Sequence, residues 1–171
     1  MTPVTPSVSE AAVRISPMTM IPAHADAAEA LTEIAVAAKS HWGYPPGWLN
    51  RWRKELTITP GYLAEHTAFS AVLDGRMAGF YALHLEAGEA LLDHLWVRPS
   101  CMRQGVGRAL FEHAEATARK AGASRLKITG DPHAEEFYLR MGAKLSGRQP
   151  APMDDQERFL PLFEKALHPP A

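Results

Sequence analysis

The sequence from Val97 to Leu110, VRPSCMRQGVGRAL, joins a strand-like run to a helix-forming run through a short glycine-containing loop. The first turn of a helix has backbone N–H groups without internal partners, and its dipole adds partial positive charge. Glycines in such a loop remove side-chain bulk where an anion must approach the main chain. Arg103 and Arg108 bracket the loop with full charges. The segment therefore predicts an α/β chain that holds a pyrophosphate.

The loop departs from two better-known glycine motifs. The dinucleotide fingerprint G-x-G-x-x-G needs a third glycine where this chain has Leu110, and it follows the first strand of its domain. The P-loop G-x-x-x-x-G-K-[ST] needs a Gly-Lys-Ser/Thr sequence that the chain lacks. A different pyrophosphate ligand is therefore expected, and a regulator that binds a nucleotide through this loop stays an alternative.

Hydrophobic periodicity along the chain predicts a mixed architecture. Alternating or apolar runs predict strands at 13–18, 67–73, 76–85, 90–97, 125–129, 143–148 and 159–164. Helical spacing and terminating residues predict helices at 22–40, 50–56, 106–121 and 132–141. This order predicts an α/β (α+β) fold in which about four helices flank a mixed, mostly antiparallel sheet of about seven strands.

Length and composition indicate one domain at 13–167 after a flexible lead-in at 1–12 of the 171 residues. The net charge is −1 and no Lys/Arg-rich run occurs, which argues against nucleic acid as a partner. Cys101 is the single cysteine, so no internal disulfide can form and a reducing compartment is expected. The sequence shows no apolar run of the length of a signal peptide or a membrane span. We therefore expect a cytoplasmic protein with no membrane partner.

Two further features concern the chemistry of single side chains. The eight histidines are scattered without an H-E-x-x-H motif or a Cys/His cluster of zinc-like spacing, so no metal site is expected. Cys101 lies beside the glycine loop. It is either a small loop residue, which we favour, or a covalent acyl carrier.

Two blocks of sequence resemble the GNAT-type N-acetyltransferases. The window from Met102 to Gly107 is similar to the acyl-CoA loop of this superfamily, [QR]-x-x-G-x-[GA], with Met102 replacing the usual Gln or Arg. The segment from Ser124 to Gly147 resembles the family pattern N-x-x-A-x-x-F/L-Y-x-x-x-G-F, with Asp131 at the Asn position and Tyr138 at the Tyr. The resemblance covers about residues 13–165, and it includes a subgroup whose members often lack an assigned substrate.

The resemblance implies a GNAT fold with a splay between the fourth and fifth strands, and acetyl-CoA as the cofactor. Its phosphates are expected on the loop and its pantetheine arm along the fourth strand. The implied cofactor-binding residues are Leu95, Trp96, Val97, Met102, Arg103, Gln104, Gly105, Val106, Gly107, Arg108, Asp131 and Tyr138.

Acyl transfer from a thioester to an amine needs an oxyanion donor, a proton donor to sulfur and a way to deprotonate the amine. By family resemblance, Tyr138 is expected to be the acid, unless it only packs on the pantetheine arm. A backbone N–H between Leu95 and Val97 is expected to be the oxyanion donor.

The general base is open. By the resemblance, Leu91 stands where many family members carry an early Glu, so Asp93 and His94 are the first candidates, followed by His84 and Glu86. Strict alternation would place Leu91, Asp93, Leu95 and Val97 on one face and Leu92, His94 and Trp96 on the other. A purely structural role stays an alternative for each candidate.

The resemblance implies an N-acetyltransferase that acts on a primary amine of a small molecule, amino acid or peptide by direct attack in a ternary complex. The alternative is a catalytically silent acyl-CoA sensor or scaffold. The segment HWGYPPGW at 41–48 either fills the core or walls the acceptor pocket. A cationic amine is expected to be attracted by His84 together with four acidic residues, Glu86, Glu89, Asp93 and Asp131. A homodimer is a further prediction.

Overall fold

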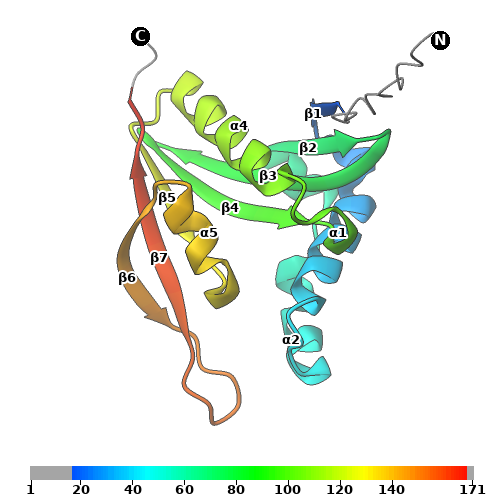
Figure 1. Cartoon of the computed structure of the whole chain (residues 1–171), viewed down its shortest axis with the longest axis vertical. Coiled ribbons are helices and arrows are strands. Elements are labelled where there is room, and N and C mark those ends of the chain that lie inside the picture. Colours follow the sequence, from blue (N-terminus) through cyan, green and yellow to red (C-terminus); the bar gives the residue numbers. More distant parts are fainter. Residues whose placement is uncertain (1–16, 169–171) are drawn as a thin grey trace, which may run out of the picture.

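One parallel strand pair joins two antiparallel groups of strands in a single sheet (Figure 1). The computed structural model describes residues 17–168. The described part of the chain forms a sheet of seven strands, and their order across the sheet is β1-β2-β3-β4-β5-β7-β6. The strands are β1 (Met18–Pro22), β2 (Thr67–Leu73), β3 (Arg76–Glu86), β4 (Glu89–Val97), β5 (Arg125–Thr129), β6 (Lys144–Pro150) and β7 (Phe159–Ala166).

Five α-helices and three short 3₁₀ turns connect these strands. Their bounds are α1 (Ala28–Ser40), α2 (Pro46–Leu56), α3 (Pro60–Glu65), α4 (Val106–Lys120), α5 (Glu135–Arg140), η1 (Ala25–Ala27), η2 (Pro99–Cys101) and η3 (Pro132–Ala134). Within residues 17–168, no helix is both long and apolar enough to cross a membrane.

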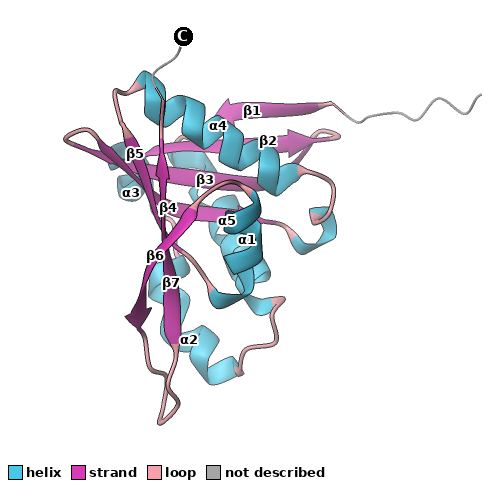
Figure 2. Cartoon of the chain, turned by 60° about the vertical axis from the view of Figure 1, so that its left-hand side comes forward, coloured by secondary structure: helices cyan, strands magenta, loops and turns pink. Residues whose placement is uncertain are grey.

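The two strand groups diverge beyond the parallel pair. β4 and β5 pair only from Glu89 opposite Arg125 to Leu92 opposite Ile128. β4 then continues to Val97 without a strand partner on that side in the described part of the chain, while β5, β6 and β7 swing away (Figures 1 and 2). The predicted mixed sheet with a splay between its fourth and fifth strands is confirmed.

A bulge interrupts β4 at the start of the divergence. Ala82 pairs with His94, but the next residue of β3, Leu83, pairs with Leu92, so Asp93 is an extra residue. A bulge of this kind bends its strand and changes which side chains share a face. The predicted alternation is therefore wrong at this point.

Helices cover both faces of the sheet and produce two apolar clusters. α4 places residues such as Leu110 and Phe111 against one face, where they are fully buried with Phe163 of β7. Leu31 and Ile34 of α1 are fully buried on the other face, in a cluster that includes α2 and α3. Full burial of such side chains contributes about 1.5–3 kcal/mol each, so both helix layers fix the geometry of the central strands.

Most predicted elements are confirmed, and the differences lie near the N-terminus. The strand predicted at 13–18 falls mostly outside the described residues, and β1 ends at Pro22, where a helix was expected to begin. Pro22 pairs with Phe69 of β2, so the helical segment begins only after it, and α1 starts at Ala28. α3 was missed, although Thr59 caps it by accepting a hydrogen bond from the Tyr62 N–H.

Candidate active site

A large cleft occupies the gap between the diverging strands. Its volume is about 1570 Å³, which exceeds the ~300–1,000 Å³ typical of a site for one small ligand. The end of β4, the loop at 102–108, α5 and the turn before it line one part of the cleft. The C-terminal half of α1, part of α2 and residues 149–158 line the other part. The cleft therefore has room for two ligands.

The glycine loop carries a row of backbone donors beside this cleft, and every residue from Met102 to Arg108 except Gln104 lines it. The N–H groups from Arg103 to Arg108 have no hydrogen-bond partner within the part of the chain that the structure describes. The first helical bond of α4 is made by Ala109, whose N–H donates to the Gly105 carbonyl at 3.0 Å. Successive unpaired N–H groups at a helix N-terminus form a concave site for an anion. A pyrophosphate site of the kind predicted from the sequence needs such a row of donors, and the assignment of the loop to this ligand stays a prediction.

The two glycines of the loop have different roles. Gly105 has a φ of 80°, a left-handed conformation that favours glycine, and a Cβ there would meet nothing within 4 Å. Gly107 lies inside α4, and a Cβ there would lie 3.3 Å from Phe137 Cε2 and 3.7 Å from Val97 Cγ2. The prediction that both glycines open space for the anion is therefore corrected, because Gly107 lets α4 pack against α5.

Tyr138 of α5 lies at the base of the cleft with its side chain buried. Its ring packs on Phe163, with 5.3 Å between the ring centroids. Burial raises the pKa of the Tyr138 hydroxyl, and the negative charge of Asp131 raises it further. Across residues 17–168 the hydroxyl has no hydrogen-bond partner, although it belongs to a residue that lines the cleft. Tyr138 therefore holds its proton firmly and faces a ligand-sized space.

The side chains of the consecutive residues Asp93 and His94 approach each other at the bulge, with 3.9 Å between Asp93 Oδ2 and His94 Nε2. Leu92 packs in the α4 cluster together with Leu95, whereas Trp96 belongs to the opposite cluster. The predicted grouping of Leu92 with Trp96 is therefore wrong, and its cause is the extra residue Asp93. Asp93 Oδ2 accepts a hydrogen bond from the Tyr62 hydroxyl of α3.

His94 is held by an indole donor. Trp96 Nε1 donates to His94 Nδ1 at 2.9 Å, and since an indole can only donate, the proton of the neutral imidazole lies on Nε2. Burial lowers the pKa of His94, although the nearby charge of Asp93 opposes this effect. His94 is therefore neutral near pH 7, and its one lone pair on nitrogen is already used.

The other predicted acid–base candidates lie outside the cleft. Leu91 is exposed, and His84 and Glu86 are exposed on β3 away from the cleft, with 3.9 Å between His84 Nε2 and Glu86 Oε2. Glu89 pairs with Lys127 at 3.2 Å. The expectation that all four acidic residues and His84 line the cleft is therefore wrong, because only Asp93 and Asp131 of this set reach it.

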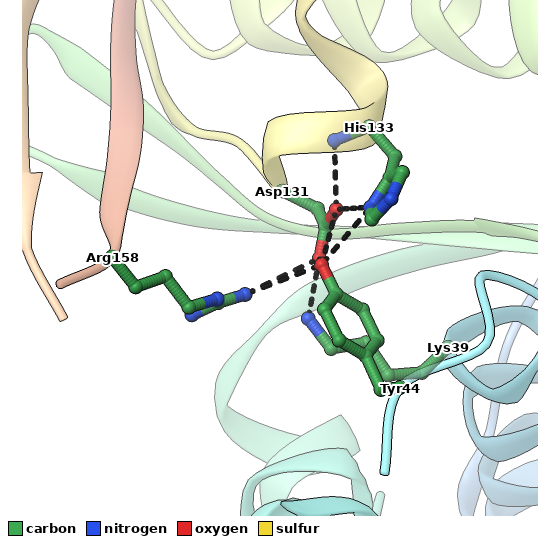
Figure 3. Close-up of polar contacts among 5 residues, drawn as sticks. All are labelled: Lys39, Tyr44, Asp131, His133 and Arg158. Carbon is green, nitrogen blue, oxygen red and sulfur yellow. Dashed lines mark hydrogen bonds and ion pairs between the residues drawn. The ribbon is translucent and has the colours of Figure 1, made fainter. Parts of the chain in front are cut away.

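Asp131 is the centre of a cluster of five polar side chains, four of which line the cleft (Figure 3). We define the Asp131 cluster as Lys39, Tyr44, Asp131, His133 and Arg158. Lys39 Nζ lies 2.5 Å from Asp131 Oδ2, the Tyr44 hydroxyl donates to the same carboxylate at 2.9 Å, and the His133 N–H donates to Oδ1 at 2.9 Å. Both carboxylate oxygens therefore already accept hydrogen bonds from within the chain.

Charge in the Asp131 cluster is fixed by these contacts. Burial alone would raise the pKa of Asp131, but the charge and hydrogen bond of Lys39, together with the bonds from His133, hold that pKa below its usual range. Burial lowers the pKa of Lys39, and the attraction of Asp131 only partly offsets this. Asp131 is therefore ionised at neutral pH, and it is not available to attract a cationic amine.

Lys39 and Arg158 were missed by sequence reasoning, because nothing in their local sequence marks them. Tyr44 lies in the aromatic segment at 41–48, which was expected to fill the core or to wall the acceptor pocket, and it reaches Asp131 from 87 positions away. The tryptophans of the aromatic segment and α2 take both predicted roles, since some line the cleft and one fills the core. Trp42 and Trp52 line the cleft, whereas Trp48 is buried in the core and donates through Nε1 to Asp154 at 2.8 Å.

Cys101 is a buried thiol in the α4 cluster and does not line the cleft. The structure therefore agrees with the interpretation of a small loop residue. Residues 17–168 contain no group of three or more His, Cys, Asp or Glu side chains that could hold a metal ion.

The splayed mixed sheet and the N–H-rich loop at a helix N-terminus together define a fold of the acetyltransferase class. The model of the acetyltransferase (GNAT) family matches residues 28–143, more than half of the chain, and the chain belongs to this family. The resemblance found in the two sequence blocks is thereby confirmed. The family transfers acetyl groups from acetyl-CoA.

Solved structures share this fold at low sequence identity. A GCN5-related N-acetyltransferase from Rhodopseudomonas palustris has a TM-score of 0.74 at 21% identity, covering 89% of this chain and 97% of its own. PaiA N-acetyltransferase from Thermoplasma acidophilum, in complex with coenzyme A, has a TM-score of 0.69 at 18% identity, covering 88% and 99%. The ribosomal-protein-S18-alanine N-acetyltransferase from Escherichia coli has a TM-score of 0.69 at 20% identity, covering 91% and 97%. No curated protein matches the sequence significantly, and likeness at these identities shows the fold alone.

Proposed function

We propose that this chain is an N-acetyltransferase that moves the acetyl group of acetyl-CoA to a primary amine in a ternary complex. The observation that carries the proposal is the row of unpaired N–H groups from Arg103 to Arg108 at the edge of a cleft large enough for two ligands. Membership of the acetyltransferase family supports the same donor.

The residues of the cleft fit this donor. The loop from Met102 to Arg108 would hold the pyrophosphate, since its N–H groups are unpaired and the space beside Gly105 is open. The outer edge of β4 from Leu95 to Val97 has no strand beside it, so its main chain would pair with an extended pantetheine arm. Met102 removes one polar side chain relative to the family pattern, but it leaves the backbone donors unchanged.

Acetyl-CoA supplies a thioester whose carbonyl carbon accepts the amine. A C–N bond forms, the C–S bond breaks, the nitrogen loses one proton and the sulfur gains one. We propose that Tyr138 delivers the proton to sulfur, because its hydroxyl is buried, unpartnered and firmly protonated. A backbone N–H between Leu95 and Val97 would stabilise the negative charge on the carbonyl oxygen.

We propose Asp93 rather than His94 as the group that takes the proton from the amine. The Nδ1 lone pair of His94 already accepts the Trp96 indole, so a second proton there would break that bond. Asp93 lines the cleft, and only its Oδ2 is engaged by Tyr62, which leaves Oδ1 for the amine or for a bridging water.

The test combines binding and turnover. Calorimetric titration with coenzyme A should show binding, and thiol release from acetyl-CoA should depend on an added amine. The variant Tyr138→Phe should lower kcat by at least roughly ten-fold, since general acid catalysis contributes ~10²–10⁴-fold, while the Kd for coenzyme A changes little.

Tyr81→Phe is the matched control, because Tyr81 is also a buried tyrosine but bonds His113 and Thr117 outside the cleft. It should keep the wild-type kcat. Full activity of the Tyr138→Phe variant would remove the acid role. Binding of coenzyme A without thiol release on any amine would favour the silent sensor or scaffold, and failure to bind would end the proposal.

A further inference from the structure

Arg158 is a buried cation whose hydrogen-bonding capacity is mostly unused. Only 11% of its side chain is exposed, and it lies just before β7 at the wall of the cleft. Its recorded polar contacts all come from Nη2, which lies 3.4 Å from the Tyr44 hydroxyl and 3.6 Å from Asp131 Oδ2. A guanidinium has five N–H donors, so most of them lack a partner among residues 17–168.

These unused donors are reachable from the cleft. In the described part of the chain, the only side-chain N or O atom that is both fully sealed and unpartnered is Ser70 Oγ. The unpaired nitrogens of Arg158 therefore keep some accessible surface, and the space beside Arg158 is the cleft that it lines. The aromatic faces of Trp52 and Tyr44 hold the guanidinium in place, at 4.8 and 5.5 Å from the ring centroids.

The charges around Arg158 do not balance. Lys39 lies 2.5 Å from Asp131 and neutralises it, which leaves the positive charge of Arg158 in excess within the Asp131 cluster. Glu55 also lines this part of the cleft, but it is exposed and forms no ion pair with either cation within 4.0 Å. Arg158 shares Asp131 with Lys39 at the longer distance of 3.6 Å, so the carboxylate of an incoming ligand would be its closest ionic partner and would be bound strongly.

The location of Arg158 assigns this anion to the acceptor rather than to the acetyl donor. Arg158 lies with Lys39, Trp42 and Trp52 in the part of the cleft formed by α1, α2 and the segment before β7. The pyrophosphate loop lies in the other part, at the start of α4. The two ligands would therefore meet near Tyr138 from opposite parts of the cleft.

We propose that Arg158 binds the carboxylate of the acceptor, so that the substrate is an amine that also carries a carboxylate, such as an amino acid. This inference rests on the proposed N-acetyltransferase function. The planar guanidinium suits a carboxylate through two parallel hydrogen bonds. With Lys39 paired to Asp131, one positive charge is left for the acceptor, which matches a monoanionic carboxylate better than a dianionic phosphonate or phosphate.

Binding of the acyl product tests this inference without turnover. The probes are N-acetylated amino acids and the matching carboxamides, titrated against the full chain with saturating coenzyme A and followed by tryptophan fluorescence, since Trp52 stacks on Arg158. We expect saturable binding for at least one carboxylate and at least ten-fold weaker binding of its carboxamide. Equal binding of each pair, or no carboxylate that binds, would overturn the inference. N-acetyl-aminomethylphosphonate that binds more tightly than N-acetylglycine would also overturn the carboxylate assignment.

Two variants locate the effect. Arg158→Gln should abolish the difference between carboxylate and carboxamide, while calorimetry shows unchanged coenzyme A binding. Arg148→Gln is the matched control, because Arg148 is an exposed arginine on β6 that pairs with Glu135 outside the cleft. It should keep the wild-type preference. A preference that survives in Arg158→Gln would refute the role of Arg158.

Turnover separates the two proposals. Thiol release should be faster with free amino acids than with their amides, and Arg158→Gln should raise KM for the acid with a smaller effect on kcat. Release with amides or polyamines but not with acids would overturn the carboxylate inference and keep the acetyltransferase. Failure to bind coenzyme A would overturn the acetyltransferase itself, whatever the carboxylate titration shows.

Discussion

Alanine substitutions at the two loop glycines should have different consequences. At Gly105 the φ of 80° forces an alanine into the left-handed region, which costs about 1–2 kcal/mol. Part of this loss is offset, because alanine has less conformational freedom than glycine in the unfolded chain, an effect of ~0.4–1 kcal/mol. We expect Gly105→Ala to lower the free energy of unfolding by about 1 kcal/mol.

At Gly107 two effects of similar size oppose each other. Alanine is better than glycine inside a helix by ~0.8–1 kcal/mol. The new methyl group would lie 3.3 Å from the ring of Phe137, which must move by a few tenths of an ångström. Phe137 is only half-buried, so this movement costs about 1 kcal/mol, the low end for overpacking. Gly107→Ala should therefore leave the free energy of unfolding within about 1 kcal/mol of the wild type.

Urea unfolding with linear extrapolation measures both changes, and calorimetry measures coenzyme A binding. Gly105→Ala should raise the Kd for coenzyme A by about ten-fold, which corresponds to a loss of ~1.4 kcal/mol of binding free energy. The reason is that the left-handed turn at this residue orients the N–H groups of the loop toward the anion. Gly107→Ala should raise it by less than about three-fold, since its methyl group faces Phe137 rather than the loop. The reasoning is refuted if Gly107→Ala is the more damaging variant in both measurements.

Two further predictions follow from burial. The pKa of Asp131 is lowered in the folded state, so its carboxylate stabilises the fold above the unfolded value near ~3.9, and this contribution is lost as the pH falls through the lower folded value. Urea unfolding at several pH values should show this acid loss in the wild type and a flatter profile in Asp131→Asn; identical profiles would contradict it. Cys101 is buried away from the cleft, so native protein should react slowly with a thiol reagent, and Cys101→Ala should keep wild-type turnover. Loss of turnover in that variant at unchanged stability would revive the covalent acyl carrier.

Elements with strong local patterns could be predicted from the sequence. β2 and β5 match their predicted ranges, because their apolar runs and flanking turns are encoded within a few residues. The N–H-rich loop is equally local, since one left-handed glycine and the start of α4 create it. The GNAT motifs added the splay, which no local pattern encodes.

The acceptor side of the site could not be predicted. A single extra residue at Asp93 reverses the faces of β4, and a bulge has no reliable sequence signal. Lys39 of α1 and Arg158 of the segment before β7 meet Asp131 from elsewhere in the chain, 92 positions away in the case of Lys39. Such convergence depends on how the whole chain packs. The cytoplasmic location and the homodimer stay predictions.

The Asp131 cluster also acts as a mechanical brace. β4 and β5 share only four paired positions, which is a narrow hinge between the two wings of the sheet. Lys39 and Tyr44 come from one wing, Arg158 comes from the other, and Asp131 at the end of β5 ties them across the gap (Figure 3). The width of the opening is thus set by four side chains remote from the pyrophosphate loop. If the proposed function holds, we expect mutations in this brace to change which acceptor is used while coenzyme A binding is unchanged.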